Sequence, residues 1–196
     1  MAEKDTELII AYFPTADAAQ EAGHHLKEWD KERKDIELGA MSILTLDEKG
    51  EVKEDKVGAR AGGKGAKWGM IAGAALGILT GGVTLIGGAL VGLLAGGLGG
   101  SLFHKAIGMS DDDQARLEKH LKEGGAALAV MMDPDEIEST VSELQSLNAE
   151  VASYLIPEDV MQHMDRMAKG DAVIHELAEK YTEGEVIVDE SGNPEE

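Results

Sequence analysis

A long uncharged segment rich in glycine constrains this chain more than any other feature. Residues 68–103 form a run of 36 residues without a charged side chain, and 12 of them are glycine. Glycine weakens a helix in water by about 1 kcal/mol relative to alanine, so this density is unusual for an ordinary core element. Many of the glycines nevertheless recur at every fourth position, which is helical spacing. Together with Gly65, which lies just before the run, these glycines form two stripes: Gly65, Gly69, Gly73, Gly77 and Gly81, then Gly88, Gly92, Gly96 and Gly100.

The stripes predict two helices that pack closely against each other along their glycines. A row of glycine leaves a flat groove in which two backbones can approach and gain dispersion contacts. One helix of the whole run would be about 54 Å long, well beyond a hydrocarbon core of about 30 Å, whereas two arms would span about 26 Å each. We therefore predict a glycine-zipper helical hairpin with its turn near residues 81–88.

The ends of the uncharged run predict contact with a membrane surface. The aromatic residues Trp68 and Phe103 bound the run. Cations lie just outside it: Lys64, Lys67, His104 and Lys105. Aromatic rings at headgroup depth with cations beyond them are typical of a membrane interface, and the cations favour its cytoplasmic side. Glycine and alanine make up 17 of the 36 residues, however, so the run is only modestly hydrophobic. The alternative is a soluble homo-oligomer that buries its hairpins in a common core.

The charge of the chain is distributed unevenly. The whole chain has a formal net charge of −20. Residues 58–109 contain four basic residues and no acidic one, which leaves 14 basic and 38 acidic residues elsewhere, a net charge of −24. A chain this acidic lacks the basic face that binds phosphates, so we expect no nucleic-acid partner. The absence of cysteine excludes disulfides, thiolate catalysis and Cys-ligated metals.

The segment before the insertion reads as a strand, a helix and a hairpin. ELIIAYF (residues 7–13) is short, apolar and β-prone, and Thr15 can cap a helix running to about residue 34. Residues 35–46 read as a second strand, with residues 51–57 as its hairpin partner. The first ten residues, MAEKDTELII, do not resemble an export signal. We therefore expect the protein at the cytoplasmic face of the inner membrane or, in the soluble alternative, in the cytoplasm.

The segment after the insertion repeats the strand–helix–strand order. An acidic helix N-terminus begins at Ser110, and AALAVMM (residues 126–132) and EVASYLI (residues 150–156) read as strands on either side of a helix that Asp133 opens. Two similar βαβ units predict an α+β fold, the ferredoxin-like split β-α-β sandwich, unless their likeness is a coincidence between common units. The insertion then lies between the second and third core strands, and both its ends must lie on one side of any membrane.

These patterns divide the chain into five parts. A C-terminal amphipathic helix is predicted over residues 158–181, with a methionine-rich packing face, and the acidic tail beyond it contains EVIVD, which could pair as an edge strand. The predicted parts are the first half of the sandwich (1–57), the Gly-rich hairpin (58–109), the second half (110–156), the C-terminal helix (157–181) and the tail (182–196).

Several motifs of catalytic or ligand-binding proteins occur only in part. GARAGGKG (residues 58–65) resembles a phosphate-binding loop but has Gly65 where Ser or Thr must hold magnesium. Glu21 and His24 form one arm of a di-iron carboxylate site without the second arm. Asp159 with His163, and residues 171, 175 and 179, are spaced as solvated helical pairs. We predict no enzyme, no metal and no cofactor.

The order of these parts resembles a bacterial family of unknown function. Its pattern is an N-terminal strand with an Ala/Glu-rich helix, a D-x-x-G-x-V turn (here Asp47, Gly50 and Val52), a Gly/Ala-rich hydrophobic hairpin, and a final strand–helix–strand. The resemblance covers residues 7–156, and members of the family are described as predicted membrane proteins related to general-stress and low-temperature-induced proteins. It implies no catalytic residues. We therefore expect a non-enzymatic, self-associating, stress-related membrane protein; the alternatives are the soluble homo-oligomer, as a scaffold or shell, and a small-ligand sensor.

Overall fold

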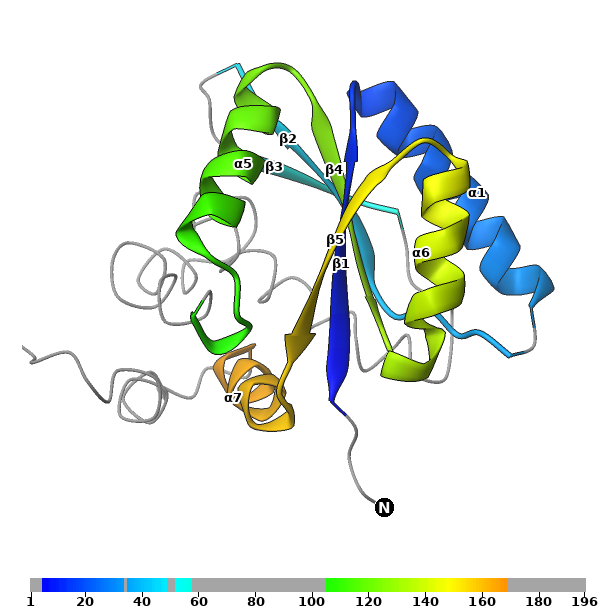
Figure 1. The fold of residues 1–196 in the computed structure, drawn as a ribbon, viewed down its shortest axis with the longest axis vertical. Coiled ribbons are helices and arrows are strands. Elements are labelled where there is room, and N and C mark those ends of the chain that lie inside the picture. The colour runs from blue at the N-terminus through cyan, green and yellow to red at the C-terminus, as the bar shows by residue number, and fades with distance from the viewer. Residues whose placement is uncertain (1–4, 34, 49–51, 58–104, 169–196) are drawn as a thin grey trace, which may run out of the picture.

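The chain folds around a five-stranded antiparallel sheet (Figure 1). The structure, a computed structural model, describes residues 5–33, 35–48, 52–57 and 105–168. The strands are β1 (Thr6–Phe13), β2 (Met41–Leu46), β3 (Val52–Lys56), β4 (Ala126–Met132) and β5 (Glu150–Ile156). Their order across the sheet is β3-β2-β4-β1-β5.

The sheet order is that of a split β-α-β sandwich with one added edge strand. Strand β1 lies between the two strands of the second unit, with Ile10 opposite Ala129 of β4 on one side and Ala152 of β5 on the other. A helix connects β1 to β2 and another connects β4 to β5, and β3 extends the sheet as a hairpin with β2. The predicted α+β class is confirmed. Of the predicted hairpin segment (58–109), residues 58–104 lie outside the described residues and residues 105–109 are described.

Two helices cover one face of the sheet. They are α1 (Ala16–Glu32) and α6 (Ile137–Ser146), and a short 3-10 turn, η1 (Pro134–Glu136), precedes α6. As predicted, Thr15 caps α1: its hydroxyl accepts a hydrogen bond from the Ala18 amide at 3.2 Å. Alternate residues of the strands face these helices, so Ile9, Ala11 and Phe13 pack against Leu26 in one hydrophobic core.

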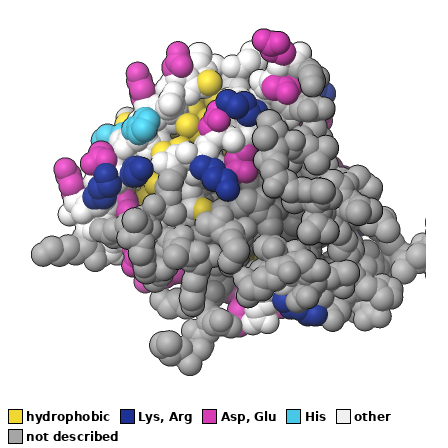
Figure 2. All heavy atoms as spheres, turned by 180° about the vertical axis from the view of Figure 1, so that it is seen from behind, with side chains coloured by type: hydrophobic (Ala, Val, Ile, Leu, Met, Phe, Trp, Pro, Cys, Tyr) yellow, Lys and Arg dark blue, Asp and Glu magenta, His cyan; other side chains and the backbone are white. Residues whose placement is uncertain are grey.

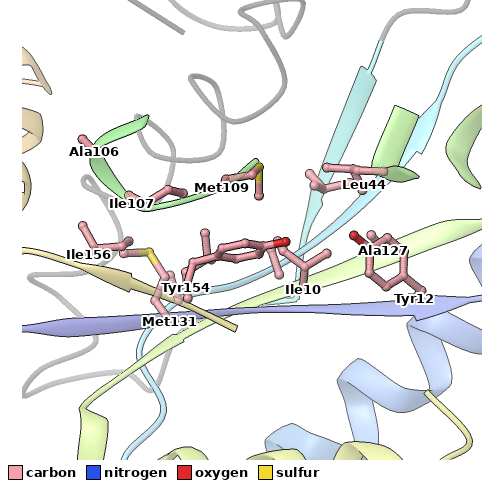
Figure 3. Close-up of a cluster of buried hydrophobic side chains, with 14 of the residues drawn as sticks. Ile10, Tyr12, Leu44, Ala106, Ile107, Met109, Ala127, Met131, Tyr154 and Ile156 are labelled. Carbon is pink, nitrogen blue, oxygen red and sulfur yellow. The ribbon is translucent and has the colours of Figure 1, made fainter. Parts of the chain in front are cut away.

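The opposite face of the sheet is covered by residues that follow the insertion and by the C-terminal part of the described chain. Helices α5 (Asp111–Lys122) and α7 (Glu158–Ala168) lie on this side (Figure 1). The segment just before α5 adds three buried side chains, Ala106, Ile107 and Met109, which lie over Ile10 and Tyr154 in Figure 3. A second hydrophobic core therefore fills the face that Leu8, Ile10 and Tyr12 present.

The predicted strand over residues 35–46 is shorter in the structure, because residues 35–40 form an irregular connection. The Leu38 amide donates to the buried Asp30 carboxylate of α1 at 2.9 Å. The Glu37 amide donates to the Glu136 carboxylate at 2.8 Å. In a longer strand, these two amides would donate to a neighbouring strand. Because they donate to helix carboxylates instead, β2 begins only at Met41.

Candidate functional site

A cluster of polar and aromatic side chains lies between α5 and the sheet. Asp113, Arg116 and His120 recur at helical spacing on the face of α5 that meets β1 and β5. The Arg116 guanidinium lies 4.7 Å from the centre of the Tyr12 ring, a cation–π distance. The His120 ring meets the same phenol edge to face, with centroids 5.2 Å apart. Tyr12 is therefore held between two side chains of α5.

His120 also ties α5 to the end of β1. Its Nε2 donates to the Phe13 carbonyl oxygen at 2.8 Å, which fixes the proton on that nitrogen. The space beside the ring exists because residue 125 is glycine: a Cβ there would lie 2.4 Å from Nε2. Gly125 thus allows the chain entering β4 to pass close against His120.

Two buried phenol hydroxyls face each other in this cluster. The hydroxyl groups of Tyr12 and Tyr154 point toward one another in Figure 3, and neither has a hydrogen-bond partner of ordinary geometry in the described part of the chain. Burial raises the pKa of both phenols; Arg116 opposes the rise for Tyr12, and Tyr12 and Asp113 add to the rise for Tyr154. Both phenols are therefore neutral at pH 7.

The charged members of the cluster lie at its rim. Arg116 forms an ion pair with Glu150 of β5, and their side chains are 40% and 74% exposed. Such exposed pairs contribute about 0–1 kcal/mol. Asp113 completes a capping box with Ser110, and the hydrogen bond from the Ser110 hydroxyl lowers the pKa of its carboxyl group. The hydroxyl that the structure shows bonded to a carboxylate here is that of Ser110, and this bond forms part of the cap of α5. We assign the cluster the structural role of fixing α5 on the sheet.

These cluster residues were not singled out by the sequence analysis. Tyrosine in an otherwise apolar strand, and acidic, basic and histidine residues on one face of α5, were the available signals. Neither signal predicts that α5 and β1 come into contact, because they are about a hundred residues apart in the chain.

Both flanks of the insertion are attached to the domain. The Val57 amide donates to the Met41 carbonyl at 3.0 Å, and its carbonyl accepts from the Lys27 ammonium at 3.3 Å. A Cβ on Gly23 of α1 would lie 3.0 Å from the Val57 side chain, so glycine lets the departing chain lie against α1. The returning chain enters the core on the α5 side at Ala106 and Ile107. The insertion therefore leaves on one face of the sheet and returns on the other.

Most of the predicted packing and interface residues lie outside the described residues. These are the nine stripe glycines together with Lys64, Lys67, Trp68, Phe103 and His104. Lys105 is described: it is exposed and directly precedes the buried Ala106. Among the described residues, no helix is both long and apolar enough to cross a bilayer.

The incomplete metal motifs gain no further ligands where the structure describes them. His24 is exposed on α1, and the described residues contain no group of three side chains placed to hold a metal ion. His25 is also exposed on α1, and it pairs with Glu143 of α6 at 2.6 Å. Residues 171, 175 and 179 and the loop at 58–65 lie outside the described part.

An open depression of about 490 Å³ lies where α1 begins and α6 ends. It is lined by Phe13, Pro14, Ala18, Glu21, Ala22, His25, Leu147 and Asn148. Its titratable side chains are those of Glu21 and His25, and His25 is already paired with Glu143. Seen from behind, the described surface mixes acidic and basic side chains (Figure 2), unlike the continuous basic face that binds phosphates.

The sheet order, the helices on both faces and the insertion after β3 define a split β-α-β domain with a long inserted segment. Residues 63–169, more than half of the chain, match a family described as a protein of unknown function, DUF1269. The chain belongs to this family. No curated protein matches the chain, and no solved structure does.

The matched range differs from the one that the resemblance predicted. The match starts within the insertion rather than at residue 7, and it ends just after α7 rather than at residue 156. Helix α7 therefore lies inside the matched range, although the resemblance, which ended at residue 156, placed this helix beyond the family's pattern. The family description assigns no function.

Proposed function

We propose that the protein is a non-catalytic, self-associating protein, held at a membrane by a glycine-zipper hairpin within residues 58–104. The observation that supports this proposal best is the attachment of both flanks of the insertion to one sheet. Val57 is hydrogen-bonded to β2, and Ala106 and Ile107 are buried in the core. Since one domain cannot lie on both sides of a bilayer, an insertion that enters the membrane must return to the side it left.

The chain before Trp68 is long enough to bring the two arms of the hairpin together. The insertion leaves the domain at Val57 and returns to it at Ala106, on opposite faces of the sheet. The ten residues 58–67 can extend over about 33 Å, more than the separation of two packed layers of about 10 Å. The arms can therefore meet along their glycine stripes after leaving the domain separately.

The charge distribution supports one orientation at a membrane. Residues outside 58–109 carry a net charge of −24, which opposes the approach of the domain to an anionic surface. The cations at the base of the insertion, including the exposed Lys105, oppose that effect locally, with about 1 kcal/mol each near such a surface. The proposed orientation places the base of the insertion at the headgroups and the acidic sheet domain in the cytoplasm. By its family resemblance, the proposed setting is a stress response.

Fluorescence of Trp68 tests whether the insertion enters lipid. The chain has two tryptophans, so a Trp29→Phe variant makes Trp68 the only emitter. We expect its emission to shift to the blue when liposomes containing anionic lipid are added, because the indole moves into the headgroup region. The shift should weaken with salt. A second variant with Trp68→Phe instead keeps only Trp29 of α1 and should not respond.

The same measurement identifies the soluble alternative. If hairpins pack together in a water-soluble assembly, Trp68 is already buried and emits in the blue without lipid. Emission that ignores liposomes, from a monodisperse particle in detergent-free buffer, contradicts membrane association. Recovery of the protein in the soluble fraction after cell lysis at low salt would contradict it as well.

A further inference from the structure

The two edges of the sheet differ sharply in how they are protected against pairing with another strand. Four of the five residues of β3 are charged (VKEDK), a common protection of an edge strand. Strand β5 (EVASYLI) has one charged residue, at its first position, and neither lysine nor proline. Among the described elements no strand lies beyond β5, which faces the viewer in Figure 1. Within the part of the chain that the structure describes, the β5 edge is therefore open to another strand.

An apolar side chain is exposed along this open edge. Leu155 is 44% exposed, the large hydrophobic side chain that stands out among the described residues. By strand alternation it lies on the α6 face of the sheet together with Val151 and Ser153. Helix α6 contacts β5 and carries the half-buried Ile137 and Val141 one turn apart. Apolar surface thus continues from the strand edge onto the adjacent helix.

We propose that β5 pairs antiparallel with β5 of a second copy of this chain, about a two-fold axis at Ser153. In that register Leu155 lies opposite Val151 of the second copy, and Ser153 lies opposite itself. Glu150 lies opposite Ile156 of the second copy, so the strand's one carboxylate never faces its own copy. Like charges directly opposite would be destabilising, and a self-complementary strand is what a two-fold interface requires.

This pairing deepens the self-association proposed above, but it uses a surface separate from the glycine stripes. It joins two five-stranded sheets into one continuous sheet of ten. Seven residues of strand and one helix side form a small interface, in the class below about 1,200 Å² that gives weak complexes. The dimer should therefore depend on protein concentration.

Cysteine crosslinking of the full chain tests both the surface and its register. The chain contains no cysteine, so a single Ser153→Cys substitution at this exposed position gives a unique thiol. Opposed Cα atoms of antiparallel strands lie about 4.5–5.5 Å apart, within the 4.4–6.8 Å range of a disulfide. We expect Ser153→Cys to form a disulfide dimer on mild oxidation. A mixture of Leu155→Cys and Val151→Cys should form the corresponding mixed dimer.

The control is Gln20→Cys, an equally unique thiol exposed on α1. Crosslinking of Ser153→Cys that is no faster than that of Gln20→Cys overturns the proposal. Repeating both in a Gly73→Leu/Gly77→Leu background separates the two surfaces: dimers through β5 should persist there even if assembly through the stripes is lost.

A charge pair adds a test that does not depend on a covalent bond. In the Gly73→Leu/Gly77→Leu background, which removes assembly through the stripes, Ser153→Lys and Ser153→Glu should each be monomeric, because like charges meet across the two-fold axis, and a mixture of the two should dimerise. Light scattering measures the mass, and circular dichroism checks that each variant is folded. Folded Ser153→Lys that still dimerises as the parent does would overturn the proposal.

Discussion

At the scale of single residues, the start of α5 is controlled by two side chains that bind each other. The Ser110 hydroxyl accepts a hydrogen bond from the Asp113 amide at 3.1 Å, and the Asp113 carboxylate accepts one from the Ser110 amide at 3.1 Å. Three consecutive acidic residues from Asp111 also favour the positive end of the helix dipole. Because α5 is the first helix after the insertion, this cap determines where the returning chain resumes the folded domain.

Ser110→Ala should destabilise the domain by about 1 kcal/mol at pH 7, because the Asp113 amide loses its acceptor. The effect should shrink in acid. The Ser110 hydroxyl lowers the pKa of Asp113 in the folded state. The stabilisation that this hydrogen bond gives the folded state is therefore fully present above the unfolded-state pKa of Asp113, about 3.9. It is lost as the pH falls through the lower folded-state pKa. Urea unfolding at pH 7 and pH 3 measures both values. Ser146→Ala, at the exposed end of α6, is the control. An equal loss at both pH values would contradict the linkage.

At the scale of elements, the strands and caps were predictable because their signals are local. Strands β4 and β5 have the predicted bounds, and Thr15 and Ser110 cap the predicted helices. The irregular connection at residues 35–40 was not predictable, since its amides bind carboxylates supplied by α1 and η1. The polar cluster around Tyr12 was not predictable either, because its members come together only when α5 packs on the sheet.

The predicted hairpin is the element whose packing depends most on single side chains. Gly73→Leu combined with Gly77→Leu should raise helix propensity but reduce assembly, because two bulky side chains fill the groove that the glycines leave. Ala75→Leu is a matched control, since it lies about 200° around the same predicted helix. Size-exclusion chromatography and chemical crosslinking measure the change. Assembly that survives the double substitution, or that Ala75→Leu reduces equally, would rule out the glycine zipper.

At the scale of the whole molecule, the first half of the chain is required to complete the sheet of the second half. Strands β4 and β5 do not pair with each other; each pairs with β1, which lies between them. The family match begins at residue 63 and so contains β4 and β5 without β1. The matched segment therefore cannot form this sheet alone, and the residues before the insertion belong to the same folding unit.

This shared folding unit determines the expected topology of the protein at a membrane. Gln20→Cys before the insertion and Ala115→Cys after it are both at exposed positions of the domain. In sealed vesicles, a membrane-impermeant maleimide should label both from the same side, because β1 pairs with β4 and β5. Thr84→Cys, near the predicted turn, should be labelled from the opposite side if both arms cross the bilayer, since each can span about 26 Å. Detergent should expose all three thiols equally. Labelling of the two domain positions from opposite sides would contradict the membrane hairpin, and labelling of Thr84→Cys from the domain's side would show that the arms do not cross.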